Sequence, residues 1–380
     1  MRSLPFLLVT CLALLLCTSQ VVRDVPERAG AARHGEQGPG VQEQGTQESG
    51  AQESGAQGPG AQGHRGRAGA RGHTARGPGV EQHAYSYGPL PRQRLVAYSD
   101  PNPARPGPRR TGLLVVHGGF WYQQRSAGWN RWAGRIAAAG PAVFSLDYRR
   151  NTDAPWPAQR DDVLRALRWI RHRADRFGLD PQRIVLLGSS AGGQVAAAAG
   201  TYGAGRRHIA GVVALSPVAD PYRAWRTPRA ADGDRAGLAV LRANAERLAG
   251  CDPSAAGAAR KHAEGPVRGP ARERERARSP EACLRVWRDM SAAGRASGAD
   301  DPPMLLVHSR HDFVPVAHSR AVRDAEVRHG MAADDVTVMT VPGDKHGGGL
   351  LTSPGVERTV LSWIAARTTP APAPYGRIHR

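Results

Sequence analysis

From about residue 90 onward, short runs of leucine and β-branched residues alternate with longer amphipathic stretches, and this alternation restricts the fold more than any other feature of the chain. Helical connections between successive strands make those strands parallel. The sequence therefore predicts an α/β domain with a mostly parallel sheet and helices on both faces. The expected strands are Leu113–Val116, Ala142–Leu146, Arg183–Leu187, Gly211–Leu215, Met304–Val307 and Val336–Val341.

The clearest predicted helix runs from about Pro157 to Phe177, between the second and third of these strands. Its apolar side chains recur at spacings of three or four residues, which places them on one helix face. They are Val163, Leu167, Ile170 and Ala174.

The first residues of the chain are typical of a secretory signal peptide. Residues 1–19 combine Arg2 with an apolar run from Leu4 to Cys17, which is short for a membrane-spanning helix. We therefore expect a secreted, extracellular protein. A membrane anchor or a lipoprotein facing outward is the alternative, and only that alternative implies a membrane contact.

The next segment, residues 20–90, is rich in Gly and Gln and has few aliphatic side chains, with glycine at every fifth position from Gly40 to Gly60. Such a segment cannot bury enough apolar surface to offset its ordering entropy. We expect a disordered linker there, a folded domain over residues 91–368, and a disordered tail over residues 369–380.

The chain is strongly basic, with 52 basic and 33 acidic residues and a formal net charge of +19 at pH 7. No basic run with interleaved aromatic residues and no known nucleic-acid-binding motif accompanies this charge. We therefore expect no nucleic-acid partner, although a diffuse basic surface can attract anionic polymers.

Only two cysteines, Cys251 and Cys283, lie outside the first 19 residues. In an oxidising compartment an even pair favours a disulfide, and two thiols alone make a poor zinc site. We predict a disulfide between them and no metal. Two unpaired buried thiols are the alternative.

The strongest chemical signal is the pentapeptide Gly188-Ser189-Ser190-Ala191-Gly192, which directly follows a predicted strand and precedes a helix-forming run of small residues. A serine at the centre of such an elbow stands clear of the sheet. The flanking glycines are needed because a Cβ there would strike the neighbouring strand or helix. We predict Ser190 as a nucleophile and interpret Ser189 as a bystander.

A second signal, His117-Gly118-Gly119, follows the predicted strand Leu113–Val116. Glycines at this position leave backbone N–H groups exposed. Together with the N–H of Ala191, those of Gly118 and Gly119 are the predicted donors of an oxyanion hole. An ordinary glycine turn with a structural His117 is the alternative.

A serine hydroxyl needs a neighbouring base, and the base needs an acid that orients it and stabilises its charged form. Asp312 follows the strand Met304–Val307, and His346 follows the strand Val336–Val341. Both lie on loops beyond strand ends, where a parallel sheet collects its site. We predict a catalytic triad of Ser190, Asp312 and His346.

Other residues compete for the acid and base roles. Two histidines precede Asp312 and two fall in the helix expected after it, so we interpret all four as solvated or packing residues: His308, His311, His318 and His329. Asp344 would act as the acid only with a reversed loop geometry. We interpret it as surface charge.

The stretch from about Arg94 to Ala366 resembles the esterase and lipase group of α/β hydrolases whose oxyanion loop begins His-Gly-Gly, which includes acetyl-xylan and feruloyl esterase-like enzymes and arylformamidases. Besides the triad, the similarity to secreted, actinobacterial-type members rests on Asp147-Tyr148-Arg149, Trp156-Pro157-Ala158-Gln159 and the pair Cys251 and Cys283. This resemblance implies the α/β-hydrolase fold, no cofactor, and a structural role for Asp147 and Arg149.

Three positions depart from that family pattern. Phe120 replaces a third oxyanion-loop glycine, Ser189 stands where aspartate is frequent, and Ser309 replaces the glycine usual after His308. None of these changes removes a catalytic group.

Two regions bear on the substrate. Residues 222–300 occupy the place where the family carries a lid, and we expect a lid or insertion there; its polar part, Ser254 to Pro280, is either a solvated loop or a substrate gate. The four aromatic residues after the oxyanion loop either pack the neighbouring helix or line an aromatic-accepting pocket: Trp121, Tyr122, Trp129 and Trp132.

The expected activity is hydrolysis of carboxylic esters through an acyl-enzyme, with short-chain acyl or carbohydrate-linked esters as substrates. The same residues could cleave peptides or formamides. A catalytically silent module that binds an acidic polymer is the alternative from another class.

Overall fold

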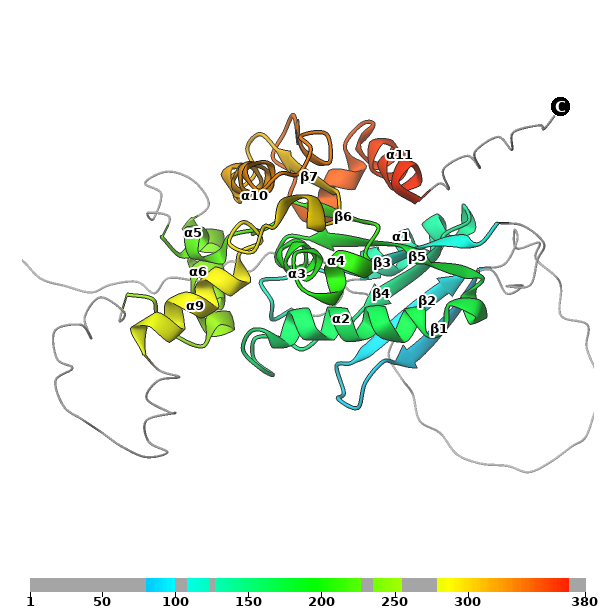
Figure 1. Cartoon of the computed structure of the whole chain (residues 1–380), viewed down its shortest axis with the longest axis horizontal. Helices are drawn as coiled ribbons and strands as arrows, with labels where there is room; N and C mark the ends of the chain where they lie inside the picture. The colour runs from blue at the N-terminus through cyan, green and yellow to red at the C-terminus, as the bar shows by residue number, and fades with distance from the viewer. Residues whose placement is uncertain (1–79, 100–107, 124–126, 227–234, 255–278, 369–380) are drawn as a thin grey trace, which may run out of the picture. The chain divides into compact units, whose positions relative to one another are not determined.

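The computed structural model describes five stretches of the chain (Figure 1), namely residues 80–99, 108–123, 127–226, 235–254 and 279–368. The predicted signal peptide, the predicted tail and most of the predicted linker lie outside these residues. Within the described stretches, no helix is long and apolar enough to cross a membrane.

The described residues form one eight-stranded sheet in the order β1-β2-β4-β3-β5-β6-β7-β8. Strand β2 pairs antiparallel with both β1 and β4, and all the other neighbouring strands are parallel. The strands are β1 Glu81–Ser86, β2 Arg94–Ser99, β3 Arg110–Val116, β4 Ala142–Leu146, β5 Leu179–Ser189, β6 Gly211–Leu215, β7 Met304–Ser309 and β8 Val336–Val341.

All six predicted strands are present, and three of them, β4, β6 and β8, have the predicted bounds at both ends. The central strands read as continuous apolar runs because helices cover them on both faces. Every residue of β4 and of β6 is buried. The predicted α/β fold class is confirmed.

Strand β1 corrects the predicted linker, which was expected to extend to residue 90. It pairs with β2 along its whole length, from Glu81 opposite Ser99 to Ser86 opposite Arg94. Five of its six side chains are exposed, so this edge strand lacks the apolar alternation that marks a half-buried strand in a sequence. The folded part of the chain therefore includes residues 81–90.

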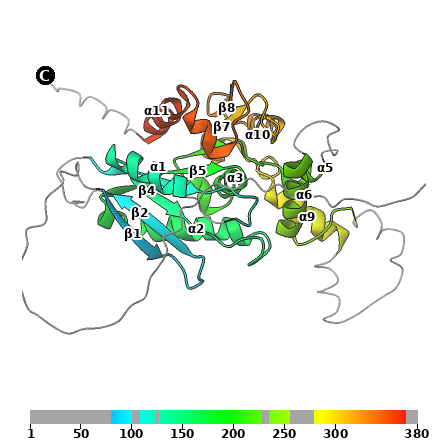
Figure 2. The same ribbon diagram turned by 180° about the vertical axis from the view of Figure 1, so that it is seen from behind.

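Helices cover both faces of the sheet (Figures 1 and 2). Leu114 and Val116 of β3 belong to a core shared with α2 and α3, whereas Leu113 and Val115 belong to a core shared with α1 and α11. This division follows from the alternation of side chains along a strand. The α-helices that the structure describes are α1 Ala127–Ala138, α2 Ala158–Arg171, α3 Ala191–Gly200, α4 Ala204–His208, α5 Pro221–Arg226, α6 Arg235–Ala249, α9 Pro280–Met290, α10 Ala317–Arg328 and α11 Val356–Thr368.

The long helix predicted over Pro157 to Phe177 is divided in the structure. Its α-helical part, α2, ends at Arg171, and a 3-10 helix follows over Ala174–Phe177. Gly178 then takes a left-handed conformation, with φ 55°, which ends the helical segment before β5.

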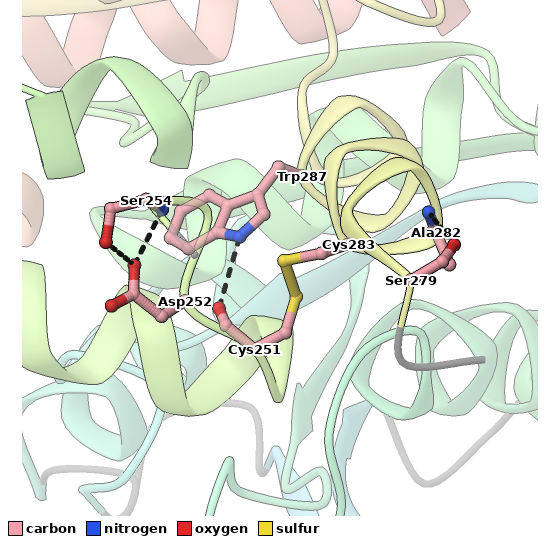
Figure 3. The surroundings of a disulfide bond; sticks show 7 residues. All are labelled: Cys251, Asp252, Ser254, Ser279, Ala282, Cys283 and Trp287. Atoms are coloured by element: carbon pink, nitrogen blue, oxygen red, sulfur yellow. Dashed lines mark hydrogen bonds between the residues drawn. A yellow bond between two sulfur atoms is a disulfide. The ribbon is translucent and has the colours of Figure 1, made fainter. Parts of the chain in front are cut away.

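The described part of the predicted insertion contains α5, α6 and α9, and a disulfide joins two of these elements (Figure 3). Cys251, just after α6, is bonded to Cys283 in the first turn of α9, with their Cα atoms 5.9 Å apart. The Trp287 indole N–H donates to the Cys251 carbonyl at 3.3 Å. The predicted disulfide is thus present. Most of the polar stretch Ser254 to Pro280 lies outside the described residues.

Candidate active site

Ser190 lies at the sharp turn between β5 and α3, with φ 53° and ψ −118°. This conformation is strained for a residue with a side chain, and such strain concentrates at functional sites. A Cβ on Gly188 would lie 2.4 Å from the Gly192 carbonyl oxygen, and one on Gly192 would lie 2.2 Å from the His117 carbonyl oxygen. The glycines are therefore required on both sides of the turn, as the sequence predicted.

The Ser190 side chain faces a cavity. Its backbone N–H donates to the Leu215 carbonyl at 2.8 Å, which fixes the turn against β6. The Ser190 hydroxyl lines the cavity together with His117, Gly118, Gly119 and His346. Among the described residues this hydroxyl has no hydrogen-bond partner, so it is not engaged in holding the fold.

The predicted oxyanion loop lies across the elbow. A Cβ on Gly118 would lie 2.7 Å from the Ser189 carbonyl oxygen, so the loop approaches the nucleophile turn more closely than a larger residue allows. Among the described residues, the N–H groups of Gly118, Gly119 and Ala191 donate to no protein acceptor. These three amides are therefore free to donate to a bound oxyanion.

Two side-chain hydrogen bonds hold the segment that contains this loop in place. The Tyr148 hydroxyl donates to the His117 carbonyl at 2.9 Å, and the Trp121 indole N–H donates to the Gln194 side chain on α3 at 2.9 Å. The buried His117 ring stacks on Tyr148, with ring centroids 4.7 Å apart. His117 thus has a structural role within the loop.

The Asp-Tyr-Arg element is structural, as the family resemblance implied. Arg149 makes a bidentate contact with the fully buried Asp162 carboxylate, at 2.7 Å and 2.9 Å. Asp147 accepts from the Tyr148 backbone N–H at 3.1 Å. Both residues fix the segment that carries Tyr148.

The predicted acid and base are in direct contact. The His346 ring nitrogen Nδ1 lies 2.7 Å from Asp312 Oδ1. An imidazole that donates from Nδ1 leaves Nε2 able to accept a proton, which is the tautomer a general base requires. Phe313 packs against the His346 ring, with centroids 4.3 Å apart, and further limits its orientation.

The Asp312 carboxylate is held in its charged form. Burial on its own raises the pKa of this carboxyl, but interactions with His308, His346 and Ser216 outweigh burial and bring the pKa well below its ordinary value. Asp312 is therefore ionised across the neutral range.

The competing residues are placed as follows. His311, His329 and Asp344 are exposed. His318 is buried and accepts from the Asp220 backbone N–H at 3.2 Å, and burial lowers its pKa to about 3. His308 is completely buried. It does more than fill space, because its Nδ1 lies 3.8 Å from Asp312 Oδ2, close to the carboxylate of the predicted triad.

Three serine hydroxyls hold the loop that carries His346. Ser189 Oγ accepts from the Gly348 backbone N–H at 3.0 Å, and Ser216 Oγ accepts from the Gly347 backbone N–H at 2.8 Å. Ser309 Oγ donates to the Lys345 carbonyl at 2.6 Å. We call these three residues the serine clamp.

The serine clamp corrects the interpretation of Ser189 as a bystander, because its hydroxyl binds the histidine loop. Ser216 was missed altogether. It directly follows β6 at the edge of the sheet where the other site residues lie, and that position was the available signal. Ser216 also has a left-handed backbone, with φ 49°, which no sequence pattern indicated.

The cavity at Ser190 has a volume of about 270 Å³. Three aromatic side chains, Phe120, Trp129 and Phe313, form part of its wall. Besides these and the residues named above, it is lined by Gln123, Ser189, Gly347 and Gly348. No described residue of the predicted lid, residues 222–300, contributes to this wall. In the described parts of the chain, no three histidine, cysteine, aspartate or glutamate side chains are grouped so that they could hold a metal ion.

Part of the chain is similar in sequence to known proteins. Residues 113–265 match the model of a family described as having the alpha/beta hydrolase fold. Esterase LipC of Mycobacterium tuberculosis H37Rv is 35% identical over 123 residues, which cover 32% of this chain and 30% of that protein. An acetyl-hydrolase of Streptomyces hygroscopicus is 37% identical over 147 residues, which cover 37% of this chain and 48% of that protein.

The similarity to solved structures extends over more of the chain. The crystal structure of esterase B from Lactobacillus rhamnosis HN001 superposes with a TM-score of 0.55 at 21% identity, over 76% of this chain and 85% of that chain. At that identity the similarity bears on the fold alone. The sequence matches, in turn, span less than half the length of both curated relatives. The domain described here has the α/β-hydrolase fold and counts esterases among its relatives.

Proposed function

We propose that the protein is a serine hydrolase that cleaves carboxylic esters through an acyl-enzyme, with Ser190, His346 and Asp312 as its catalytic triad. The observation that carries the proposal is the 2.7 Å contact between His346 and Asp312 at the rim of the cavity that Ser190 faces. Two free amides, those of Gly118 and Gly119, line the same cavity.

The reaction divides into two halves. In the first, Ser190 Oγ attacks the ester carbonyl carbon while His346 Nε2 takes the hydroxyl proton. The oxyanion accepts hydrogen bonds from Gly118, Gly119 and Ala191, and the intermediate collapses as His346 returns the proton to the departing alcohol. In the second, water attacks the acyl-enzyme, His346 again takes and returns the proton, and the carboxylic acid leaves. No step requires a cofactor.

The substrate we propose is an ester with a short acyl chain, free or attached to a carbohydrate. The small volume of the cavity and its aromatic wall of Phe120, Trp129 and Phe313 support this choice. One relative carries the name acetyl-hydrolase, which points the same way. The His117-Gly118-Gly119 loop is shared by the esterases and the arylformamidases of the group that this chain resembles, so the preference for an ester over a formamide or peptide rests on the relatives named esterase and acetyl-hydrolase.

We further propose that the protein acts outside the cell. The Cys251–Cys283 disulfide supports this, because structural disulfides persist in oxidising compartments. The apolar run from Leu4 to Cys17 agrees with export. Mass measurement of the protein recovered from culture medium tests both points.

The decisive variant is Ser190→Ala, assayed on p-nitrophenyl acetate. Turnover is expected to fall by about 10⁴-fold or more, because no other group supplies the nucleophile. The circular-dichroism spectrum should stay the same, since the Ser190 hydroxyl has no partner in the fold. Persistent turnover in this variant would refute the assignment. Parallel assays on peptide and formamide substrates separate the ester reaction from its alternatives.

A further inference from the structure

A second cavity lies beside the one that Ser190 faces. It has a volume of about 410 Å³ and lies between α1 and the segment from Gly348 to Glu357, which follows His346. Trp129, Trp132 and Leu351 give it an apolar wall. Its charged side chains, Arg135 and Glu357, form a bidentate ion pair at 2.5 Å and 2.6 Å and so neutralise each other. The cavity therefore suits an uncharged, apolar group.

Two residues, Trp129 and Gly348, line both cavities. They are also in close contact, because a Cβ on Gly348 would lie 2.8 Å from the Trp129 ring. The indole thus lies directly against the backbone of Gly348. This pair is the partition between the cavity at Ser190 and the one behind it.

The two tryptophans of the second cavity are held differently. Trp132 is buried, and its indole N–H donates to Glu357 at 3.2 Å. Trp129 is half-buried, packs edge-on against Trp132 with centroids 5.7 Å apart, and donates to no acceptor among the described residues. Trp129 is thus held by packing alone, so its removal leaves no buried polar group without a partner.

We propose that Trp129 is the residue that restricts the substrate to short chains, by closing the catalytic cavity against a latent apolar subsite. This inference rests on the proposed ester hydrolysis. Without the indole, the cavities of about 270 Å³ and 410 Å³ become continuous. An unbranched alkyl chain of the ester then extends past Gly348 toward Leu351. Each methylene that leaves water strengthens binding of the longer ester.

The test compares wild type with Trp129→Ala on two series of esters. The first varies the acyl chain, from p-nitrophenyl acetate to p-nitrophenyl octanoate. The second varies the alcohol, from ethyl acetate to octyl acetate. We expect the ratio of kcat/KM for the long ester to that for the short ester to rise at least tenfold in one series. The series that responds identifies which end of the ester enters the subsite.

A matched variant is available at Gly349, which lines only the second cavity. A Cβ there has no close neighbour, since the nearest atom is Lys345 Cβ at 3.9 Å. Gly349→Leu should leave p-nitrophenyl acetate hydrolysis unchanged in the wild-type background. In the double variant Trp129→Ala/Gly349→Leu the added side chain fills the subsite, and the gain on long esters should disappear.

A binding measurement keeps the proposal independent of turnover. Calorimetric titration of octanol into Ser190→Ala should show at least tenfold tighter binding when Trp129→Ala is added. Equal chain-length ratios and equal octanol affinity with and without Trp129 would overturn the proposal. If wild type hydrolyses none of the esters, the proposed function fails, while the titration still decides whether the subsite exists.

Discussion

The two loops that carry the nucleophile and the base are held in place by different physical means. At the Ser190 elbow, the chain approaches the neighbouring backbone so closely that Gly188 and Gly192 leave no room for a Cβ. At the His346 loop, three serine hydroxyls bind backbone groups at 2.6 to 3.0 Å. One loop is fixed by excluded volume and the other by hydrogen bonds.

This difference predicts how each loop responds to change. Close packing tolerates no added atom, and its effect is the same at any pH. A hydrogen bond tolerates some displacement of its two groups, and its contribution to stability depends on whether the groups are charged. An atom added at the glycines of the elbow should therefore impair folding, whereas removal of a serine-clamp hydroxyl should reduce catalysis and stability together.

The largest expected effect is that of Gly192→Ala. The new Cβ would meet the Val116 and His117 carbonyl oxygens at 2.3 Å and 2.2 Å, so strand β3 or helix α3 must move. We expect a loss of about 3 kcal/mol of unfolding free energy, measured by urea denaturation. The ester hydrolysis rate should fall with it.

Gly134→Ala is the matched control. Gly134 lies within α1, and its nearest neighbour would be a Tyr98 ring atom at 3.7 Å, an ordinary contact distance. Alanine in a helix interior should raise the unfolding free energy by about 0.5 to 1 kcal/mol. If both glycine variants had the same small effect, excluded volume would not be what fixes the elbow.

The next effect is that of Ser216→Ala. It removes the acceptor of the Gly347 N–H and one of the groups that hold the Asp312 carboxylate in its charged form. We expect about 1 to 3 kcal/mol of lost stability and a fall in kcat of about tenfold or more, with KM little changed. Stopped-flow and steady-state assays on p-nitrophenyl acetate separate these parameters.

Ser309→Ala provides the comparison within the serine clamp. Ser309 donates to the Lys345 carbonyl and, unlike Ser216, is not among the groups that lower the pKa of Asp312, so its replacement removes one hydrogen bond of the loop. The loss of stability should stay near 1 kcal/mol or below. A kcat defect in Ser309→Ala as large as that in Ser216→Ala would mean that all parts of the clamp contribute equally.

The smallest expected effect concerns pH. The pKa of Asp312 is lower in the folded protein than its ordinary value of 3.8, so the folded state binds the proton less tightly than the unfolded state does. The stabilisation from this carboxylate is therefore complete above about pH 4 and is lost as the pH falls below that value. Urea titrations of wild type and Asp312→Asn from pH 3 to pH 7 should show the wild-type advantage shrinking at the acid end. The effect of Gly134→Ala should not change with pH.

The nucleophile elbow could be predicted from the sequence because the residues that it needs lie close together in the chain. Gly188, Ser190 and Gly192 lie within five positions, after an apolar strand and before a run of small residues, and each glycine has a steric reason. The parallel strands were equally clear because they are buried on both faces. Asp312 and His346 could be proposed because both follow strands of one parallel sheet.

The serine clamp and the edge strand β1 could not be predicted from the sequence in the same way. The partner of Ser189 lies at Gly348, and that of Ser216 at Gly347, so each hydrogen bond spans more than 100 positions and depends on the final packing. Strand β1 is polar because it lies at the edge of the sheet, and its composition is close to that of the linker before it. Hydrogen-bond partners that lie far apart in the sequence and meet only in the folded chain produce no short sequence motif.

The central claim is that Ser190 is an activated nucleophile, and covalent labelling tests it most directly. The full chain is treated with a fluorophosphonate at neutral pH, and the modified peptide is sequenced by mass spectrometry. We predict one adduct on Ser190, with labelling slowed strongly by His346→Ala and abolished by Ser190→Ala. An unlabelled Ser190 in the folded protein, or an adduct on Ser189 instead, would contradict the account.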